Sequence, residues 1–350
     1  MQSLHPKFLK SLSLNVEHAT TLKTLGEFKG KQALFKNQTP QILESLQRAA
    51  IIESVESSNR LEGVTAPDKR LEAIVLKSTT PANRSEQEIA GYRDALNQIH
   101  ESATYMPFSV NVILQLHSVI NRYLPDSGGK WKMTANEIVE RNPDGSVHRV
   151  RFTPVEPVRT PRAMEDFVRL HRDATQRDLR EPLVVVPLTI LDFLCIHPFA
   201  DGNGRVSRLL TLLLLYHFGY EVGRFISLER IFEESKETYY ETLERSSRGW
   251  HQGRHDVFPW MTYFWGVLLA AYKEFEERVG RISTGRGAKT DMIRDAVARR
   301  MQPFNISDIE RDCPGISRDM IRVVLRAMRD QGIVAMTGKG RGAKWIRTQT

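Results

Sequence analysis

The stretch "HPFADGNGRVSR", residues 197–208, combines reactive side chains with the start of a helix. Two glycines flank Asn203 shortly before an apolar run, Leu209 to Phe218, which predicts a buried helix. Glycines let backbone N–H groups approach a ligand closely, and a helix N-terminus offers unpaired donors and the positive end of the helix dipole. The stretch therefore predicts an anion site suited to phosphates.

The charged residues of the same stretch extend this prediction. Arg205 and Arg208 are three residues apart, so on a helix their forked donors can hold successive phosphates. Asp201 offers a hard oxygen for Mg²⁺, which takes one or two carboxylates plus phosphate oxygens. His197 can be neutral at pH 7 and accept a proton from a hydroxyl. Each residue alone is common for structural reasons, but their combination predicts phosphate chemistry with its own base.

Composition bounds the class of protein. The chain has 350 residues, 41% of them hydrophobic and 26% charged, which fits a soluble globular protein with two or three domains. Its two cysteines, Cys195 and Cys313, form no readable disulfide framework. The N-terminal residues lack the apolar core of a secretory signal, and no apolar run approaches the roughly 20 residues of a membrane helix. We expect a cytoplasmic protein that does not enter a membrane.

Helical periodicity dominates, so the predicted fold class is mainly α. A long helix is expected from Pro40 to about Glu62, ended by Gly63. Further helices are predicted over residues 85–102, 108–122, 162–176, 186–196, 205–219, 236–248 and 258–279. The run "EIVERNPDGSVHRVRF" predicts a β-hairpin around its "NPDG" turn. A small, polar and basic segment, residues 280–289, is expected to be a linker.

The last segment of the chain is basic and has its own pattern. From Gly285 onwards it holds 14 Lys and Arg against 7 Asp and Glu, which accounts for +7 of the chain's net charge of +8. Capping residues at Ser307 and Ser317 predict two helices, and two short strands follow Gly332. The order of helix, helix, arginine-striped helix and hairpin is typical of a winged helix-turn-helix. Four arginines share one arc of the second helix and could follow DNA phosphates: Arg318, Arg322, Arg326 and Arg329. A protein-docking or dimerisation module is the alternative, so a homodimer also stays open.

The opening stretch resembles the signature of the Fic family, HPFx[DE]GNGRxxR, with every fixed position filled. Its surroundings are also similar, from the helix before "GGKWKM" and the hairpin to "DFLCI" before the signature and "IFEESKETYYETL" after it. The similar core covers residues 106–280, which leaves an N-terminal helical region, 1–105, and a winged-helix domain, 285–350. The resemblance implies a Fic-type helical bundle with a β-hairpin flap over the active site.

The resemblance also implies a role for each residue of the signature. His197 would be the general base that deprotonates a target hydroxyl, and Asp201 would bind a Mg²⁺ that bridges the α- and β-phosphates of ATP. The implied nucleotide-binding residues are Gly202, Asn203, Gly204, Arg205, Val206, Ser207 and Arg208, of which the first four form the anion hole and the last meets the γ-phosphate. The usual activity of the family is transfer of AMP from ATP to Ser, Thr or Tyr of a protein, with release of pyrophosphate.

Two further sites follow from the resemblance. The flap that aligns a target peptide by strand pairing would comprise Asn136, Glu137, Ile138, Val139, Glu140 and Arg141. Ser235 occupies a position where many relatives have an Asn that contacts the nucleotide, so this chain departs from the pattern there and the contact is in doubt.

A second short motif lies upstream, in "ESVESSNRLEG". Ser58 and Glu62 are four apart and share a helix face, and an acid at a helix C-terminus is unfavourably placed unless a cation compensates it. The arrangement resembles the Fic inhibitory motif, [ST]xxxE[GN], filled here by Ser58, Glu62 and Gly63. The resemblance implies that Glu62 pairs with Arg208 and so blocks productive binding of ATP.

The sequence therefore predicts an autoinhibited protein adenylyltransferase that modifies another protein or itself. Removal of AMP, or use of another nucleotide, is an alternative within the same fold. A DNA-binding regulator, with the Fic core as a nucleotide sensor, is the alternative from a different class.

Overall fold

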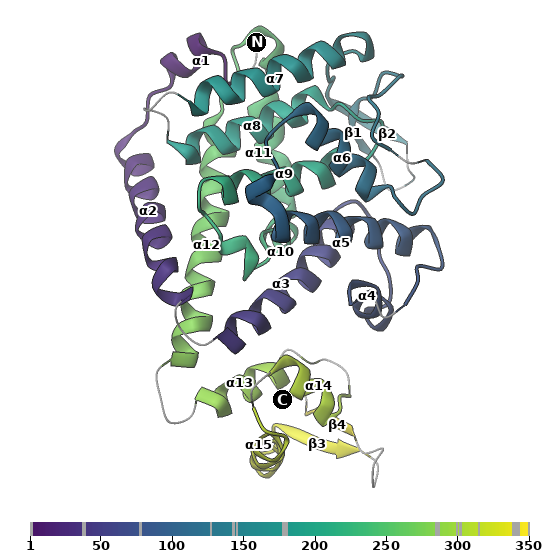
Figure 1. The fold of residues 1–350 in the computed structure, drawn as a ribbon, viewed down its shortest axis with the longest axis vertical. Helices are drawn as coiled ribbons and strands as arrows, with labels where there is room; N and C mark the ends of the chain where they lie inside the picture. The colour runs from purple at the N-terminus through teal and green to yellow at the C-terminus, as the bar shows by residue number, and fades with distance from the viewer. Residues whose placement is uncertain are drawn as a thin grey trace. The chain divides into compact units, whose positions relative to one another are not determined.

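The computed structural model describes residues 3–36, 40–76, 79–126, 128–141, 144, 146–176, 181–283, 288–298, 300, 303–313, 316–337 and 344–348. It is mainly helical, as predicted, with two small antiparallel sheets (Figure 1). The chain divides into two compact units, residues 1–30 with 50–271 and residues 31–49 with 272–350. The region predicted as 1–105 thus falls largely within the same unit as most of the predicted core.

The elements follow one another along the chain with short connections. The first helices are α1 (Pro6–Ser11), α2 (Val16–Lys36), α3 (Pro40–Leu61), α4 (Asp68–Val75), α5 (Arg84–Ser102) and α6 (Val110–Ile120). The hairpin β1 (Ile138–Arg141) and β2 (Val147–Phe152) leads to α7 (Thr160–Thr175), α8 (Pro182–Ile196) and α9 (Asn203–His217). Then come α10 (Leu228–Glu234), α11 (Lys236–Ser247) and α12 (Phe258–Ser283). Single 3₁₀ turns lie at Ala103–Tyr105, Pro157–Arg159, Val222–Arg224 and Trp250–Gln252.

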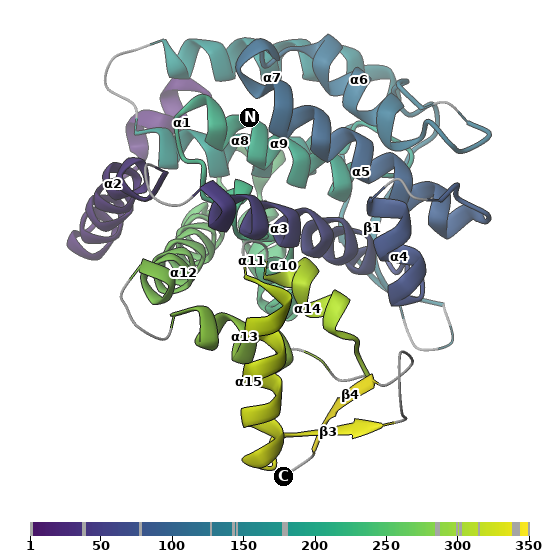
Figure 2. The same ribbon diagram turned by 60° about the horizontal axis from the view of Figure 1, so that its bottom comes forward.

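Two helices that are apolar on nearly all sides form the centre of the first unit. In α9 every residue from Val206 to Tyr216 is buried, and α8 is buried along almost its whole length. A helix without a polar face has to be surrounded by protein. Accordingly α9 contacts α8, α5 and α6, and α7 covers α8 (Figures 1 and 2). The signature stretch connects these two central helices, so a rigid framework holds both of its ends.

The predicted hairpin is confirmed. β1 pairs antiparallel with β2, from Ile138 opposite Phe152 to Arg141 opposite Val147, with two register shifts. Of its predicted turn only Asp144 lies within the described residues, and its carboxylate accepts hydrogen bonds from the N–H and hydroxyl of Ser146.

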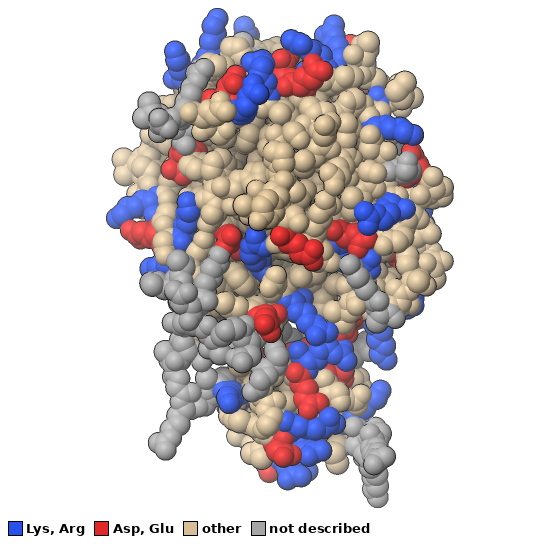
Figure 3. Space-filling model, viewed as in Figure 1, with Lys and Arg blue, Asp and Glu red and all other residues tan. Residues whose placement is uncertain are grey.

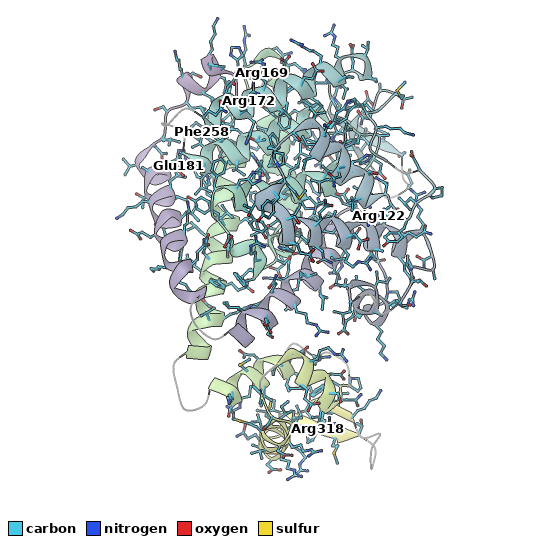
Figure 4. The ribbon with its side chains drawn as sticks, viewed as in Figure 1. Arg122, Arg169, Arg172, Glu181, Phe258 and Arg318 are labelled. Carbon is cyan, nitrogen blue, oxygen red and sulfur yellow. The ribbon has the colours of Figure 1, made fainter. Side chains whose placement is uncertain are left out.

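A buried carboxylate joins the N-terminal residues to the middle of the first unit. Asp192 of α8 accepts hydrogen bonds from Ser3 N (2.9 Å), Ser3 Oγ (2.5 Å), Leu4 N (3.3 Å) and Trp250 Nε1 (2.7 Å). Its burial raises its pKa to about 6. Further along, His18 of α2 stacks on Phe258, which Figure 4 labels at the start of α12 (ring centroids 4.8 Å). These contacts place α1 and the start of α2 against the bundle.

The second unit contains α13 (Ala288–Ala298), α14 (Ile306–Asp312), α15 (Arg318–Asp330), β3 (Val334–Thr337) and β4 (Lys344–Arg347). Its element order is the predicted one, and the two strands pair antiparallel. The two arcs predicted for α15 are also present. The buried arc comprises Ile321, Val324, Leu325 and Met328. The exposed arc holds the four predicted arginines.

Several predicted boundaries were wrong. The expected linker over 280–289 is shortened from both ends, because α12 continues to Ser283 and α13 starts at Ala288, while 284–287 lie outside the described residues. The cap of α14 is Asn305 instead of Ser307, with Asp308 completing the capping box. Helix α3 ends at Leu61, one residue before Glu62. α1, α4 and α10 were missed because each has at most eight residues, too few for a visible period. α2 was missed although it has 21 residues, because its apolar residues do not gather on one face.

None of the helices within the described residues has both the length and the apolar character needed to cross a bilayer.

We predict that Asp192→Ala lowers the free energy of unfolding by about 3 kcal/mol, because it removes the shared acceptor of four buried hydrogen bonds. Urea denaturation followed by tryptophan fluorescence measures this. Glu165→Ala, at an exposed position of α7, is the matched control and should change stability by less than about 0.5 kcal/mol. Equal effects for the two variants would mean that the Asp192 contacts do not hold the N-terminal residues.

Candidate active site

The backbone turns sharply where α8 ends. His197 has φ 50° and ψ 60°, the one left-handed conformation of a non-glycine residue in the described part of the chain. Its N–H donates to the carbonyl of Phe193 (2.9 Å) and closes the helix. Its Nδ1 lies 3.2 Å from the carbonyl oxygen of Leu194, which can only accept, so Nδ1 carries the proton in this arrangement. Nε2 of the neutral ring is then free to accept a proton.

The surroundings of His197 favour the neutral ring. Burial lowers its pKa to about 4, and the charge of Lys132 acts in the same direction. The hydrogen bond to Leu194 and the carboxylates of Glu62 and Asp201 oppose this effect without outweighing it. A neutral imidazole with an unprotonated Nε2 at pH 7 has the state required of a general base.

The turn after His197 is held by side chains on both sides. Asn203 accepts from Phe199 N (2.9 Å) and donates to Phe199 O (2.8 Å), which closes the loop on the first residue of α9. His117 of α6 stacks on the Phe199 ring at 3.7 Å. Its Nδ1 accepts from Gly129 N (2.9 Å), so its Nε2 donates to the carbonyl of Asp201 (3.2 Å). His117 was not among the predicted residues.

The start of α9 has the geometry expected of an anion site. Gly202 is its N-cap, with φ 79°, a conformation that glycine adopts without strain. The Asp201 carboxylate accepts from Gly202 N (2.6 Å), and its side chain is 75% exposed. The carboxylate can therefore meet a ligand while its position is fixed by the backbone. Within the described residues, no cluster of three or more His, Cys, Asp or Glu could hold a metal ion alone.

Arg208 is buried one turn further into α9, and its Nε and Nη2 turn towards the end of α3. Its Nε donates to Ser58 Oγ (2.8 Å), and Nη2 donates to Ser58 O (2.9 Å) and to Glu62 Oε1 (2.7 Å). Burial opposes the charged guanidinium, but the Glu62 carboxylate together with Tyr239 and Tyr92 outweighs burial, so the pKa of Arg208 is raised. The structure thus brings together the two residues that the sequence pairs as a switch.

The Glu62 carboxylate also covers the start of α9. A Cβ on Gly204 would lie 2.2 Å from Glu62 Oε1, far inside normal contact. The backbone of Gly204 is helical and does not by itself require glycine. The lack of a side chain there is what allows this carboxylate to approach closely. Glu62 itself lies in the turn that ends α3, where Gly63 has φ 77°. The Glu62 carboxylate therefore already lies next to Gly204, where a phosphate is predicted to bind.

A polar network lies behind Ser58 and fixes α3 against the bundle. Glu229 of α10 is buried, and its carboxylate accepts from Tyr92 Oη (3.0 Å) and Ser54 Oγ (2.8 Å). Ser54 is one turn before Ser58 on the same face of α3. Tyr92 also hydrogen bonds Ser58. Glu229 and Tyr92 were not among the predicted residues, because their role appears only through contacts between distant segments.

Four of the predicted nucleotide-binding residues contact other protein groups instead of the cavity. Arg205 is buried and forms ion pairs with Glu88 of α5 (2.7 Å) and with the Asp201 carboxylate (3.6 Å). Val206 is fully buried, and the hydroxyl of Ser207 donates to Gly204 O (2.8 Å). Ser235 lies between α10 and α11, where its hydroxyl contacts Ile231 O and Tyr263 Oη at 2.7 Å each. These residues anchor helices and do not line the cavity described next.

A cavity of about 270 Å³ opens over the turn and the start of α9. Predicted residues that line it are Glu62, Glu137, Ile138, His197, Asp201, Gly202, Asn203, Gly204 and Arg208. Unpredicted ones are Arg151, Phe152, Leu191, Leu194, Cys195, Ala200, Tyr239, Tyr240, Leu243, Glu244 and Ser247. The flap therefore forms one wall of the cavity and α11 forms another. In the sequence, α11 contains the pair Tyr239 and Tyr240.

The flap residues differ in their placement. Ile138 starts β1 and faces the cavity, whereas Asn136 and Glu137 precede the strand. The side chain of Asn136 donates to Phe199 O (2.9 Å) and accepts from Lys132 Nζ (2.7 Å). The carboxylate of Glu140 accepts from Arg149 (2.8 Å) and Arg151 (3.1 Å) of β2. Val139 and Arg141 belong to β1 but do not line the cavity.

The model of the Fic/DOC family matches residues 107–215, which contain α6, the flap, α7, α8 and nearly all of α9. The chain contains a Fic domain. A protein adenylyltransferase Fic of Nematostella vectensis is 24% identical over 224 residues, 62% of this chain and 46% of that protein. Protein adenylyltransferase fic-1 of Caenorhabditis briggsae is 23% identical over 273 residues, 76% of this chain and 48% of that protein. The chain thus spans about half the length of the curated relatives it matches.

The fold comparison agrees. A crystal structure of a Fic family protein from Desulfovibrio desulfuricans G20 matches with a TM-score of 0.61 at 18% identity, over 97% of this chain and 98% of that chain. At this identity the match shows the fold alone. The Fic domain therefore contains the signature turn, and α3 contributes the carboxylate that lies on it from outside residues 107–215.

We predict that Gly204→Ala is destabilising in the wild-type chain but not in Glu62→Gly, because the added methyl group collides with the Glu62 carboxylate. Without that carboxylate, alanine should be neutral or stabilising by up to about 1 kcal/mol, since it is the better helix former. The four chains form a double-mutant cycle, measured by urea denaturation, with an expected coupling of about 1–2 kcal/mol.

Gly266→Ala is the matched control, because it lies in α12 and its Cβ would meet nothing within 4 Å. Its effect should be the same in both backgrounds. Absence of coupling for Gly204 would show that Glu62 does not rest on the start of α9 in solution.

Proposed function

We propose that the protein is an autoinhibited adenylyltransferase that transfers AMP from ATP to a Ser, Thr or Tyr hydroxyl of a protein, which can be its own chain. The observation that carries the proposal is the juxtaposition of an unprotonated His197 Nε2 with the N-terminus of α9 in one cavity. A base for a hydroxyl and a site for phosphates are the two parts that such a transfer needs. The names of the curated relatives support the same reaction class.

The reaction follows from the arrangement of these groups. A hydroxyl that enters between the flap and His197 gives its proton to Nε2 while its oxygen attacks the α-phosphorus. The bond from the α-phosphorus to the bridging oxygen breaks, and pyrophosphate leaves. The backbone N–H groups of Asn203 and Gly204 would hold the phosphates at the positive end of the helix dipole. Arg208 would hold the terminal phosphate.

The residues around the turn are suited to binding one Mg²⁺ ion that enters together with the nucleotide. Mg²⁺ keeps waters and phosphate oxygens as ligands and needs only one or two carboxylates. Asp201 supplies one, exposed and fixed by its bond to Gly202 N. The ion would neutralise phosphate charge there.

Autoinhibition follows from competition for Arg208. Its guanidinium already binds the Glu62 carboxylate, and the same carboxylate covers Gly204. A phosphate would have to displace it from both places. The cavity of about 270 Å³ is also just below the usual range for small-molecule sites, which fits a site partly filled by Glu62. Removal of AMP stays the alternative within this fold, because Glu62 could there act as a base for water.

We predict that Glu62→Gly raises self-labelling with labelled Mg-ATP at least tenfold, because Arg208 becomes available to the γ-phosphate. Labelling and the thermal shift on addition of Mg-ATP are measured together. The variant should gain more thermal stability from Mg-ATP than the wild type does, since tighter binding to the native state stabilises it. Glu62→Gln, which keeps the size of the side chain but removes its charge, should fall between the two.

Two double variants test the parts of this scheme. Glu62→Gly with Arg208→Ala should lose the gain, and Glu62→Gly with His197→Ala should bind Mg-ATP but label nothing. If Glu62→Gly binds ATP and labels no protein above the wild-type level, in a cell lysate or on itself, the assignment of Glu62 as a switch is wrong; if neither chain labels any protein, the transferase assignment is wrong as well.

The second unit supports a second activity, binding of DNA through α15. All four arginines of its exposed arc reach solvent, and Arg318 is labelled at the start of this helix in Figure 4. Three of them pair with acids, Arg318 with Glu310, Arg322 with Asp319 and Arg329 with Asp330. Basic and acidic side chains accordingly lie side by side on this unit in Figure 3. Such exposed pairs are weak, so phosphates could replace the acids.

We predict that Arg322→Glu with Arg326→Glu flattens the salt dependence of DNA retention by about two units of the log–log slope, because each lost phosphate contact removes nearly one. Filter binding between about 50 and 200 mM salt measures the slope. Arg169→Glu with Arg172→Glu on α7, both labelled in Figure 4, makes the same change of charge on the first unit and should leave the slope unaltered. An unchanged slope for the α15 variant favours the protein-docking alternative.

A further inference from the structure

Two residues between α6 and β1, Lys132 and the first flap residue Asn136, reach the turn that carries His197 from outside the signature. The backbone N–H of Lys132 donates to Pro198 O (2.9 Å), and its Nζ donates to Ile196 O (3.3 Å). The Asn136 side chain accepts from the same Nζ and donates to Phe199 O. Carbonyls on both sides of His197 are thus held by one short segment that leads directly into β1.

The position of the Lys132 ammonium is unusual. The residue is 3% exposed, and within the described part of the chain no carboxylate forms an ion pair with it. Burial lowers its pKa to about 8, so it is still mostly charged at pH 7. A buried charge without a counter-charge is unfavourable. Its compensation here comes from the carbonyl at the C-terminal end of α8, where the helix dipole is negative, and from the Asn136 oxygen.

This placement affects His197 in two ways. The left-handed backbone of His197 is strained, and such a conformation persists only when its surroundings enforce it. The bonds from Lys132 and Asn136 enforce it from both sides. The ammonium also disfavours a second positive charge on the nearby imidazole, whereas Glu62 and Asp201 favour that charge.

We propose that Lys132, together with Asn136, is a positioning residue for the reaction. Its hydrogen bonds fix the turn of His197 and hold this turn at a fixed distance from the flap. Its charge keeps the His197 ring neutral, as a base requires. The proposal rests on the transferase function above. It concerns residues outside the signature, and neither of them has to touch the nucleotide or the target hydroxyl.

The experiment uses the full chain carrying Glu62→Gly, with labelled Mg-ATP as the probe. Lys132→Met removes the charge and the side-chain bonds, and Lys132→Arg keeps a charged donor. Lys130→Met is the matched control, because it removes the same charge from an exposed position in the same segment. Self-labelling rates are measured over ATP concentration and pH.

Lys132→Met should lower kcat about tenfold or more while KM for ATP changes less than about twofold, because the base and not the phosphate site is displaced. Its rate should also fall at a higher pH on the acid side than that of the parent. Lys132→Arg should recover most of the rate, and Lys130→Met should match the parent. A Lys132→Met rate and pH profile equal to those of Lys130→Met would overturn the proposal.

A second readout needs no catalysis. Titration of the His197 ring by NMR, in the otherwise wild-type chain with ¹³C-labelled histidine and assigned with His197→Ala, should show its pKa raised by about 0.5 unit or more in Lys132→Met. No shift relative to Lys130→Met would remove the electrostatic part of the proposal. This readout stays valid even if Glu62→Gly shows no labelling, so failure of the transferase function and failure of this proposal remain distinguishable.

Asn136→Ala covers the case in which Lys132→Met does not fold. It removes the bond to Phe199 and the acceptor of Lys132 Nζ but leaves the positive charge. Its kcat should fall with little change in the pH profile. If Asn136→Ala labels at the rate of the parent with an unchanged profile, the segment does not position His197.

Discussion

The guanidinium of Arg208 is the group on which the rest of the site depends. It is buried and charged, so it must keep an anionic partner within reach. Glu62 is that partner, and its carboxylate also lies on the glycine where a phosphate would bind. A carboxylate and a phosphate cannot occupy the same place. Which of the two occupies it depends on the difference between their binding free energies at that place. The phosphate site and the end of α3 therefore form one thermodynamic unit.

The network behind Ser58 limits how this unit can open. Lifting the whole of α3 would break the bonds that join Ser54 to Glu229 and Ser58 to Tyr92 and Arg208, and would leave the buried Glu229 carboxylate with one of its two donors. Turning only the Glu62 side chain breaks a single ion pair. That side chain is 29% exposed, so it can turn towards solvent while the backbone bonds of its turn, Glu62 N to Asn59 O and Gly63 N to Arg60 O, stay in place. Release is thus easiest at the last turn of α3, with the rest of the helix in place.

The parts of this arrangement that the sequence predicted are those encoded locally. A helix start with glycines, a hairpin and the two arcs of α15 each depend on neighbouring residues. The pairing of Glu62 with Arg208 was predicted only through a resemblance to a known motif. Lys132, His117, Glu88 and Glu229 were missed, because each acts through a contact with a distant segment and nothing beside it in the sequence marks it. For Arg205 the local pattern was misleading. Its place in the signature predicted a contact with a phosphate, but its guanidinium forms an ion pair with Glu88 of α5.

These contacts divide the control of the site between two frameworks. At the hydroxyl end, the turn of His197 is held by His117, Lys132 and Asn136, all within one segment that continues into the flap. At the phosphate end, Arg208 is held by α3. The base and the flap are therefore held by contacts that do not include Glu62. In the function that we propose, a change at the end of α3 alters how the nucleotide binds without breaking these contacts.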